Sequence, residues 1–220
     1  MAVLAQPHWQ TVDARLRALL VLIGQQPVAR SFYLAGGTAL ALQLGHRRSI
    51  DLDFFSAEDE LMDKTRREIV SVLEQQAVVE VREDVVGNLL LNLNGLSVGF
   101  FSYGYRLLEA VTTPGLPDLA SIADIGLMKL DALIARGARK DFIDLHFIWQ
   151  TLSLEQLLEL RPVKYPRARS FELMLLESLT NFDNADLDTM PQMLAPFNWE
   201  QAKIDFASAA KRLATRWLSL

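Results

Sequence analysis

The segment YLAGGTALALQLGHRRSIDLDFF, residues 33–55, carries the clearest structural pattern of this 220-residue chain. Two short apolar runs enclose a pair of glycines and a helix-like stretch that ends at Gly45, where a left-handed residue commonly stops a helix. The pattern predicts four elements in succession: a buried strand over 31–35, a turn at Gly36 and Gly37, a helix over 38–44 and a second strand over 50–55.

The glycine turn is the first part of this segment that indicates chemistry. Glycine lets the backbone approach a ligand closely, and the free N–H groups and dipole of a helix start favour an anion. Thr38 can cap this helix or bring its hydroxyl to a phosphate. We therefore expect a nucleotide-phosphate seat at Gly36, Gly37 and Thr38, to which Arg48 and Ser49 of the following loop add two further candidates.

Two acids on the second strand are the other feature of this segment that indicates chemistry. Residues two apart on a strand face the same side, so Asp51 and Asp53 should aim at one spot while Leu52 and Phe54 face the core. Paired carboxylates repel unless a cation lies between them, and Mg²⁺ suits oxygen ligands beside substrate phosphates. An Asp-x-Asp alone is more often a solvated edge. Its combination with the glycine turn predicts Mg²⁺-assisted phosphoryl or nucleotidyl transfer.

With these residues in place, the stretch GGTALALQLGHRRSIDLDFF resembles the signature of the AbiEii/AbiGii toxin family of nucleotidyltransferases. This family belongs to the minimal-nucleotidyltransferase, DNA-polymerase-β-like superfamily, whose pattern is a Gly-Gly or Gly-Ser turn followed by Asp-x-Asp. Gly36, Gly37, Asp51 and Asp53 match that pattern residue by residue. The resemblance implies a nucleotidyltransferase fold and a metal site at the two aspartates.

A second block, IADIGLMKLDALIARGARKDFIDLHFI (residues 122–148), is also similar to the family. The resemblance assigns the late-motif lysine to Lys129 and the Lys-Asp-x-x-Asp pattern to Lys140, Asp141 and Asp144. A cation here could hold a triphosphate and the acids could position it. Taken without the resemblance, a helix-start aspartate beside surface cations explains these residues equally well.

One position departs from the superfamily pattern, which usually has a third carboxylate on a later strand of the sheet. The corresponding strand is LSVGFFSY, residues 96–103, and its inward position is Gly99; no acid lies between Leu89 and Leu108. Two readings stay open. Either Asp141 or Asp144 replaces the missing acid, or the site binds nucleotide poorly or transfers slowly.

The turn-rich stretch TTPGLPD, residues 112–118, is the expected domain boundary. It separates a nucleotidyltransferase-like α/β domain (1–117) from a helical C-terminal domain (118–220). The whole is an α+β fold with a small mixed sheet flanked by helices. Beyond the central segment we expect helices over 9–23 and 58–76, strands over 78–82, 89–94 and 96–101, then helices over 119–136, 140–150, 154–159, 168–180 and 199–218.

Composition excludes some classes of site and of protein. There are no cysteines, which excludes disulfides and thiolate metal sites, and no signal-like or membrane-length apolar run. We expect a cytoplasmic protein with no membrane partner. At a net charge of −5, a polyanion would have to meet a local basic cluster. The clusters are expected to be solvated faces: Arg47-Arg48, Arg136-Arg139-Lys140, Arg161-Lys164-Arg167-Arg169 and Lys211-Arg212-Arg216.

The resemblance implies a toxin–antitoxin or abortive-infection enzyme that moves a nucleoside monophosphate from an NTP to an acceptor hydroxyl. Acceptors of related toxins include the 3′ end of tRNA, and a cognate antitoxin would be the protein partner. Two alternatives stay open. Gly99 favours a non-catalytic nucleotide-binding module, and the same fold also occurs in nucleotidyltransferases that modify antibiotics.

Overall fold

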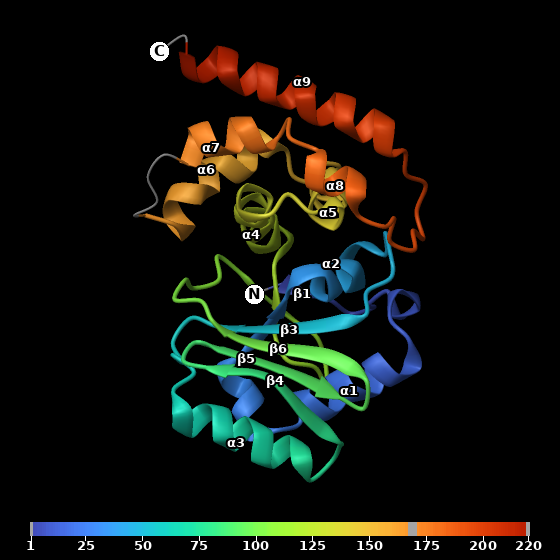
Figure 1. Cartoon of the computed structure of the whole chain (residues 1–220), viewed down its shortest axis with the longest axis vertical. Helices are drawn as coiled ribbons and strands as arrows, with labels where there is room; N and C mark the ends of the chain where they lie inside the picture. Colours follow the sequence, from blue (N-terminus) through green and yellow to red (C-terminus); the bar gives the residue numbers. More distant parts are fainter. Residues whose placement is uncertain (1, 167–170, 219–220) are drawn as a thin grey trace. The chain divides into compact units, whose positions relative to one another are not determined.

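The computed structural model describes residues 2–166 and 171–218. The chain divides into two compact units, Met1–Ser121 and Ile122–Leu220, each with its own core. We call them the first unit and the second unit. The first unit combines helices with a sheet, and the second consists of helices in its described part (Figure 1).

A mixed sheet of eight strands forms the centre of the described first unit. Its order is β1 (Ala2–Val3), β7 (Ala110–Thr112), β8 (Leu119–Ala120), β2 (Tyr33–Ala35), β3 (Asp51–Ser56), β6 (Leu96–Ser102), β5 (Asn88–Leu93) and β4 (Val79–Val85). The central strand β3 runs antiparallel to β2 and parallel to β6. It therefore places its side chains between those of two neighbouring strands.

The two faces of β3 differ in burial. Leu52 and Phe54 are fully buried, as is Phe100 of β6, which stacks on Phe54 with ring centroids 5.1 Å apart. Asp51 and Asp53 alternate with them and are half-buried. One face of the strand thus belongs to the core, and the other carries the acids.

Three helices pack on this sheet. Helices α1 (Ala14–Gly24) and α3 (Asp63–Glu74) contact β3 and β4 respectively, and both bury apolar side chains. Asp13 caps α1 by accepting a hydrogen bond from the backbone N–H of Leu16 (2.7 Å). Helix α2 (Gly36–Leu44) follows β2 directly and contacts both β2 and β3 (Figure 1). The amino end of α2 is thereby held beside the acids of β3.

In the second unit, α4 (Ile122–Ala135) is buried against three other helices. These and the remaining described helices are α5 (Arg139–Ile148), α6 (Leu154–Lys164), α7 (Phe171–Ser178), α8 (Asp183–Leu187) and α9 (Trp199–Leu218). Helix α4 contacts α5, α6 and α7, and α9 contacts α5 and α7. Phe142 of α5 lies in the aromatic core, 5.0 Å from both Phe182 and Phe206 between ring centroids.

The structure differs from expectation at several elements. The strands β1, β7 and β8 were not predicted, and the helix expected from residue 119 begins at Ile122, because Leu119–Ala120 pair with β2 and β7 as β8. Helix α8 was also not predicted. Residues 168–170 of the helix expected over 168–180 lie outside the described residues, as does Arg167.

Three of the basic residues expected to be solvated are buried instead: Arg47, Arg161 and Lys164. The Nζ of Lys164 lies 2.6 Å from Asp124, so an ion pair compensates its burial. Arg161 pairs with Glu172 at 3.2 Å. Within residues 2–166 and 171–218, no helix is both long and apolar enough to cross a membrane.

Candidate active site

The carboxylates of Asp51 and Asp53 lie on the same half-buried face of β3. The Oγ of Ser49 is 3.3 Å from the Oδ1 of Asp51, and Ser49 itself is buried. The hydroxyl donates this hydrogen bond and so helps to fix the position of the Asp51 carboxylate. Ser49, predicted to contact nucleotide, therefore supports an acid in this structure.

Gly36 brings the amino end of α2 against Asp53. Its φ is +64°, a conformation that L side chains rarely adopt. A Cβ placed on Gly36 would lie 2.7 Å from the Oδ2 of Asp53, so only a glycine leaves room for this carboxylate. The register of β2 and β3 places Ala35 opposite Asp53, which fixes this approach.

Thr38 does not cap α2, contrary to one of its two expected roles. The N-cap is Ala35, which makes no side-chain cap, because the helix begins two residues earlier than predicted. Thr38 is buried, and its hydroxyl donates to the backbone oxygen of Asp51. This bond joins the first turn of α2 to β3, while the N–H groups of that turn have no acceptor within the helix.

Arg47 is the residue of this site that the sequence did not single out. It is 5% exposed, its guanidinium lies where a Cβ of Gly37 would be, and its Nη1 donates to the backbone oxygen of Arg48 (3.0 Å). Arg48, the predicted nucleotide ligand, has an exposed side chain. A positive charge therefore lies at the glycine turn, but it belongs to Arg47. Two adjacent arginines in one loop give no sequence signal of which one is buried.

The acids of β3 fit a divalent cation that a substrate helps to hold. Among the described residues, no three His, Cys, Asp or Glu side chains come together in a way that could hold a metal ion alone. Mg²⁺ commonly takes one or two carboxylates and completes its shell with water and substrate phosphates. Two acids on one face, beside helix N–H groups that suit phosphate, provide that kind of donor set.

The strand next to Asp53 lacks the third acid, as expected. Gly99 of β6 pairs directly with Asp53 in the parallel register. A Cβ on Gly99 would lie 2.5 Å from the ring carbons Cε2 and Cζ of Phe101 and 3.2 Å from Leu90. An aromatic ring thus fills the space where an acidic side chain at residue 99 would begin.

In the second unit, Lys129 of α4 joins two acids of α5. Its Nζ is 2.8 Å from Asp141 and 2.7 Å from Asp144, both of which are fully buried. Arg136 also binds Asp141, with its Nε at 2.8 Å. Burial alone would raise the pKa of Asp141, but the charges and hydrogen bonds of Lys129 and Arg136 outweigh it and hold that pKa below 3.8.

The structure thus brings the predicted site residues together in two groups, one in each unit. The first unit holds the glycine turn and the β3 acids, and the second holds Lys129 with its two acids. Lys140 stands next to the second group in the sequence but has an exposed side chain. Its neighbour in α5, Asp141, faces Lys129 instead.

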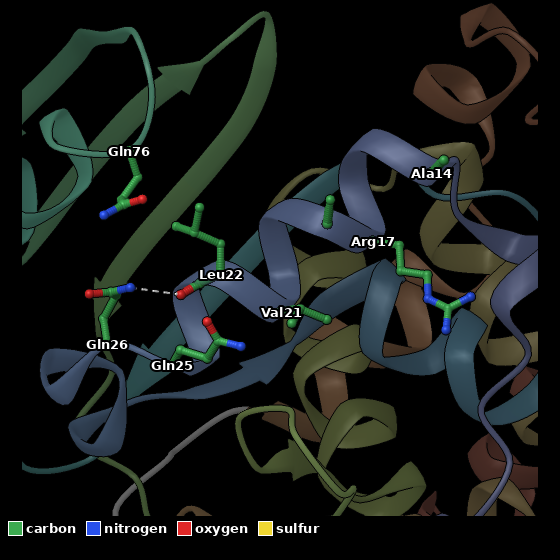
Figure 2. A pocket seen from close by; sticks show the side chains of 8 residues that line it. Ala14, Arg17, Val21, Leu22, Gln25, Gln26 and Gln76 are labelled. Carbon is green, nitrogen blue, oxygen red and sulfur yellow. Dashed lines mark hydrogen bonds between the residues drawn. The ribbon is translucent and has the colours of Figure 1, made fainter.

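A separate hollow of about 510 Å³ lies against α1. Figure 2 shows the Nε2 of Gln26 donating to the backbone oxygen of Leu22 (3.0 Å) at one end of it. Its lining residues are Ala14, Arg17, Ala18, Val21, Leu22, Gln25, Gln26 and Gln76. None of them is acidic, so this hollow offers no carboxylate of the kind found on β3.

Comparisons with known proteins identify the family of this chain. The family described as "Nucleotidyl transferase AbiEii toxin, Type IV TA system" matches residues 17–215. The uncharacterized protein aq_aa25 of Aquifex aeolicus (strain VF5) is 32% identical over 195 residues, which cover 84% of this chain and 88% of that protein.

Two solved structures share the fold. One is MenT4, the nucleotidyltransferase toxin Rv2826c of Mycobacterium tuberculosis H37Rv, which is 16% identical with a TM-score of 0.56. The match covers 90% of this chain and 82% of the MenT4 chain. The other is JHP933 of Helicobacter pylori, which is 17% identical with a TM-score of 0.51; the match covers 91% of this chain and 89% of the JHP933 chain. The family match spans nearly the whole described chain and both groups of site residues, so this protein belongs to the AbiEii family of nucleotidyltransferase toxins.

Proposed function

We propose that this nucleotidyltransferase moves a nucleoside monophosphate from an NTP to an acceptor hydroxyl, with Mg²⁺ held by Asp51 and Asp53. Nucleotidyltransferases of this kind generally use a divalent metal ion. One observation carries the proposal. Two carboxylates share a face of β3, and Gly36 brings the amino end of α2 to within contact of one of them.

Several residues of the first unit contact the NTP in this proposal. The N–H groups of Gly36, Gly37 and Thr38 bind phosphate oxygens at the positive end of α2. Arg48 reaches the nucleotide from the following loop, while Ser49 of the same loop holds Asp51 (3.3 Å). A bound Mg²⁺ supplies neutralisation of the phosphate charge that builds up during transfer. The acceptor oxygen bonds to the α-phosphorus, the bond from that phosphorus to pyrophosphate breaks, and the hydroxyl proton passes to water.

For the second unit by itself, we propose that Lys129 and Lys140 take part in nucleotide binding. Asp141 and Asp144 support the site by holding Lys129, since both lie within 2.8 Å of its Nζ. The lowered pKa of Asp141 makes it a weak proton acceptor, which favours this supporting role over that of a general base.

The family supports a toxin–antitoxin role, and it suggests a cognate antitoxin as the protein partner. We propose that the protein acts in the cytoplasm on an RNA acceptor, with the 3′ end of tRNA as the first candidate. The acceptor is the least constrained part of this proposal, because the two acids and the glycine turn specify only the nucleotide end of the reaction.

Transfer of radiolabel from each α-labelled NTP to total tRNA tests the proposal. We expect label transfer by the wild-type protein in the presence of Mg²⁺ and a drop of about 10³-fold or more in Asp51→Asn, which removes a metal ligand. Asp63→Asn is the matched control, because Asp63 is exposed and pairs with two nearby arginines of its own helix, α3. Wild-type transfer by Asp51→Asn would remove the assignment.

A second candidate function rests on Gly99. With the ring of Phe101 over this position, β6 offers no carboxylate beside Asp53. The protein would then bind nucleotide without transferring it. Under that function, an NTP with Mg²⁺ raises the melting temperature while no acceptor becomes labelled.

A further inference from the structure

The side of β3 from which an acceptor must approach follows from the position of the phosphate seat. This step rests on the proposed function. The N–H groups that bind phosphate belong to α2, which continues from β2, whereas β6 lies on the other side of β3. In nucleotidyl transfer the attacking and leaving oxygens lie roughly in line. With pyrophosphate leaving on the β2 side, the attacking hydroxyl comes from the β6 side.

The β6 side of Asp53 presents aromatic rings. Phe101 folds back over Gly99, the residue paired with Asp53, and stacks on Phe55 with ring centroids 4.9 Å apart. Both phenylalanines are half-buried. Phe55 is two residues after Asp53 on the same face of β3, which is about 7 Å along a strand.

The aromatic surface extends beyond these two rings. Tyr103 packs edge-on against Phe55 with centroids 5.5 Å apart, and Tyr105 continues the row at 5.3 Å from Tyr103. Tyr105 is 37% exposed. A row of several rings is longer than one base requires, so it suits a strand of nucleotides better than a single mononucleotide.

The row of rings indicates the class of ligand. No acid occurs in the segment between Leu89 and Leu108, and its one charged residue, Arg106, pairs with Glu58, which follows β3 (3.0 Å). Rows of aromatic rings are typical of surfaces that stack the bases of single-stranded nucleic acids.

We propose that Phe101, together with Phe55, stacks the terminal base of a single-stranded RNA acceptor and thereby positions its hydroxyl beside Asp53. In this chain an aromatic ring stands where an acid at residue 99 would begin, and it contributes by binding the acceptor. Tyr103 and Tyr105 extend this binding surface to preceding nucleotides.

Fluorescence anisotropy of a short single-stranded RNA carrying a 5′ fluorophore tests the proposal with the full chain. We expect Phe101→Leu to raise the Kd for this RNA about tenfold or more, and Phe101→Tyr, which keeps the ring, to stay within about twofold of wild type. The matched control is Phe197→Leu, since Phe197 is a half-buried phenylalanine of the second unit. Circular dichroism establishes that each variant is folded.

A second RNA, identical except for an abasic 3′-terminal residue, identifies the base involved. The wild-type protein should bind this RNA about tenfold or more weakly than the intact RNA. Phe101→Leu should bind the two RNAs with the same Kd, because the ring that stacks on the terminal base is already absent. Equal binding of both RNAs by the wild-type protein, or wild-type binding by Phe101→Leu, would overturn the proposal.

Measuring NTP binding tests the alternative that Phe101 stacks the base of the NTP and not that of the RNA. The Kd for an NTP with Mg²⁺ should be unchanged in Phe101→Leu; weaker NTP binding with unchanged RNA binding would show that the ring stacks the incoming nucleotide instead. Asp51→Asn should bind the RNA as wild type does. RNA binding lost only in Phe101→Leu, together with no transfer by wild type, would overturn the proposed function but retain the stacking surface.

Discussion

Gly36 shows how one residue joins the amino end of α2 to an acid of the proposed metal site. Its positive φ turns the chain from β2 into α2, and its missing side chain leaves room for the carboxylate of Asp53. An alanine would oppose both features, since it strains the backbone and lies 2.7 Å from the Oδ2 of Asp53. The effects on stability and on catalysis can be separated by a suitable control.

Gly104→Ala is that control, because Gly104 has a φ of +70° and a Cβ added there would meet no heavy atom within 4 Å. Both Gly36→Ala and Gly104→Ala should lower the free energy of unfolding by about 1–2 kcal/mol through backbone strain. Only Gly36→Ala should lower the transfer rate, by about 10²-fold, because it displaces Asp53. Chemical denaturation and the transfer assay measure the two effects. Equal transfer rates in the two variants would contradict this role of Gly36.

At this scale, much of the site could be predicted from the sequence. Strand alternation placed Asp51 and Asp53 on one face, and the structure has them there. The burial of Arg47 could not be predicted, because it depends on space left by Gly37 across a loop rather than on a periodic pattern. One of the two roles expected of Thr38, that of a cap, is excluded for a related reason: α2 begins at Gly36, which has a positive φ, and not at Thr38.

At the scale of elements, the ion cluster of Lys129, Arg136, Asp141 and Asp144 joins α4 to α5 inside the second unit. A buried charge is stabilising only while its partners remain, so removal of one member has a large cost. The lowered pKa of Asp141 makes this cost dependent on pH.

Asp141→Asn should lower the free energy of unfolding by about 3 kcal/mol at neutral pH. A carboxyl whose pKa is lower in the folded protein contributes stability above its unfolded pKa and loses it as the pH falls through the folded pKa. The difference between wild type and variant should therefore be full above about pH 5 and shrink as the pH falls below 3.8. Urea denaturation across this range measures it, with exposed Asp63→Asn as the reference. A difference that grows on acidification would contradict the assigned partners.

Helices and strands with long sequence patterns lie where the sequence predicts them. The hairpin at Asn94 and Gly95 and the helix over 199–218 occur where they were expected. The two- and three-residue strands β1, β7 and β8 could not be predicted, because pairing with distant segments forms them and no alternation is visible over so few residues. As a result, the sheet is larger than the small one expected.

At the scale of the whole molecule, the two site groups belong to two compact units of one chain. The family match includes the residues of both groups. The proposed chemistry depends on the first unit, because among the described residues that unit combines paired acids on a half-buried face with the amino end of a helix.

Calorimetric titration of the full chain with each common NTP, with and without Mg²⁺, measures this dependence directly. We predict that the wild-type protein binds an NTP only when Mg²⁺ is present, and that Asp53→Asn raises the Kd at least about tenfold while Asp63→Asn leaves it unchanged. Binding of NTP and Mg²⁺ by Asp53→Asn with the wild-type Kd would contradict the assignment of the β3 acids as the metal–nucleotide site.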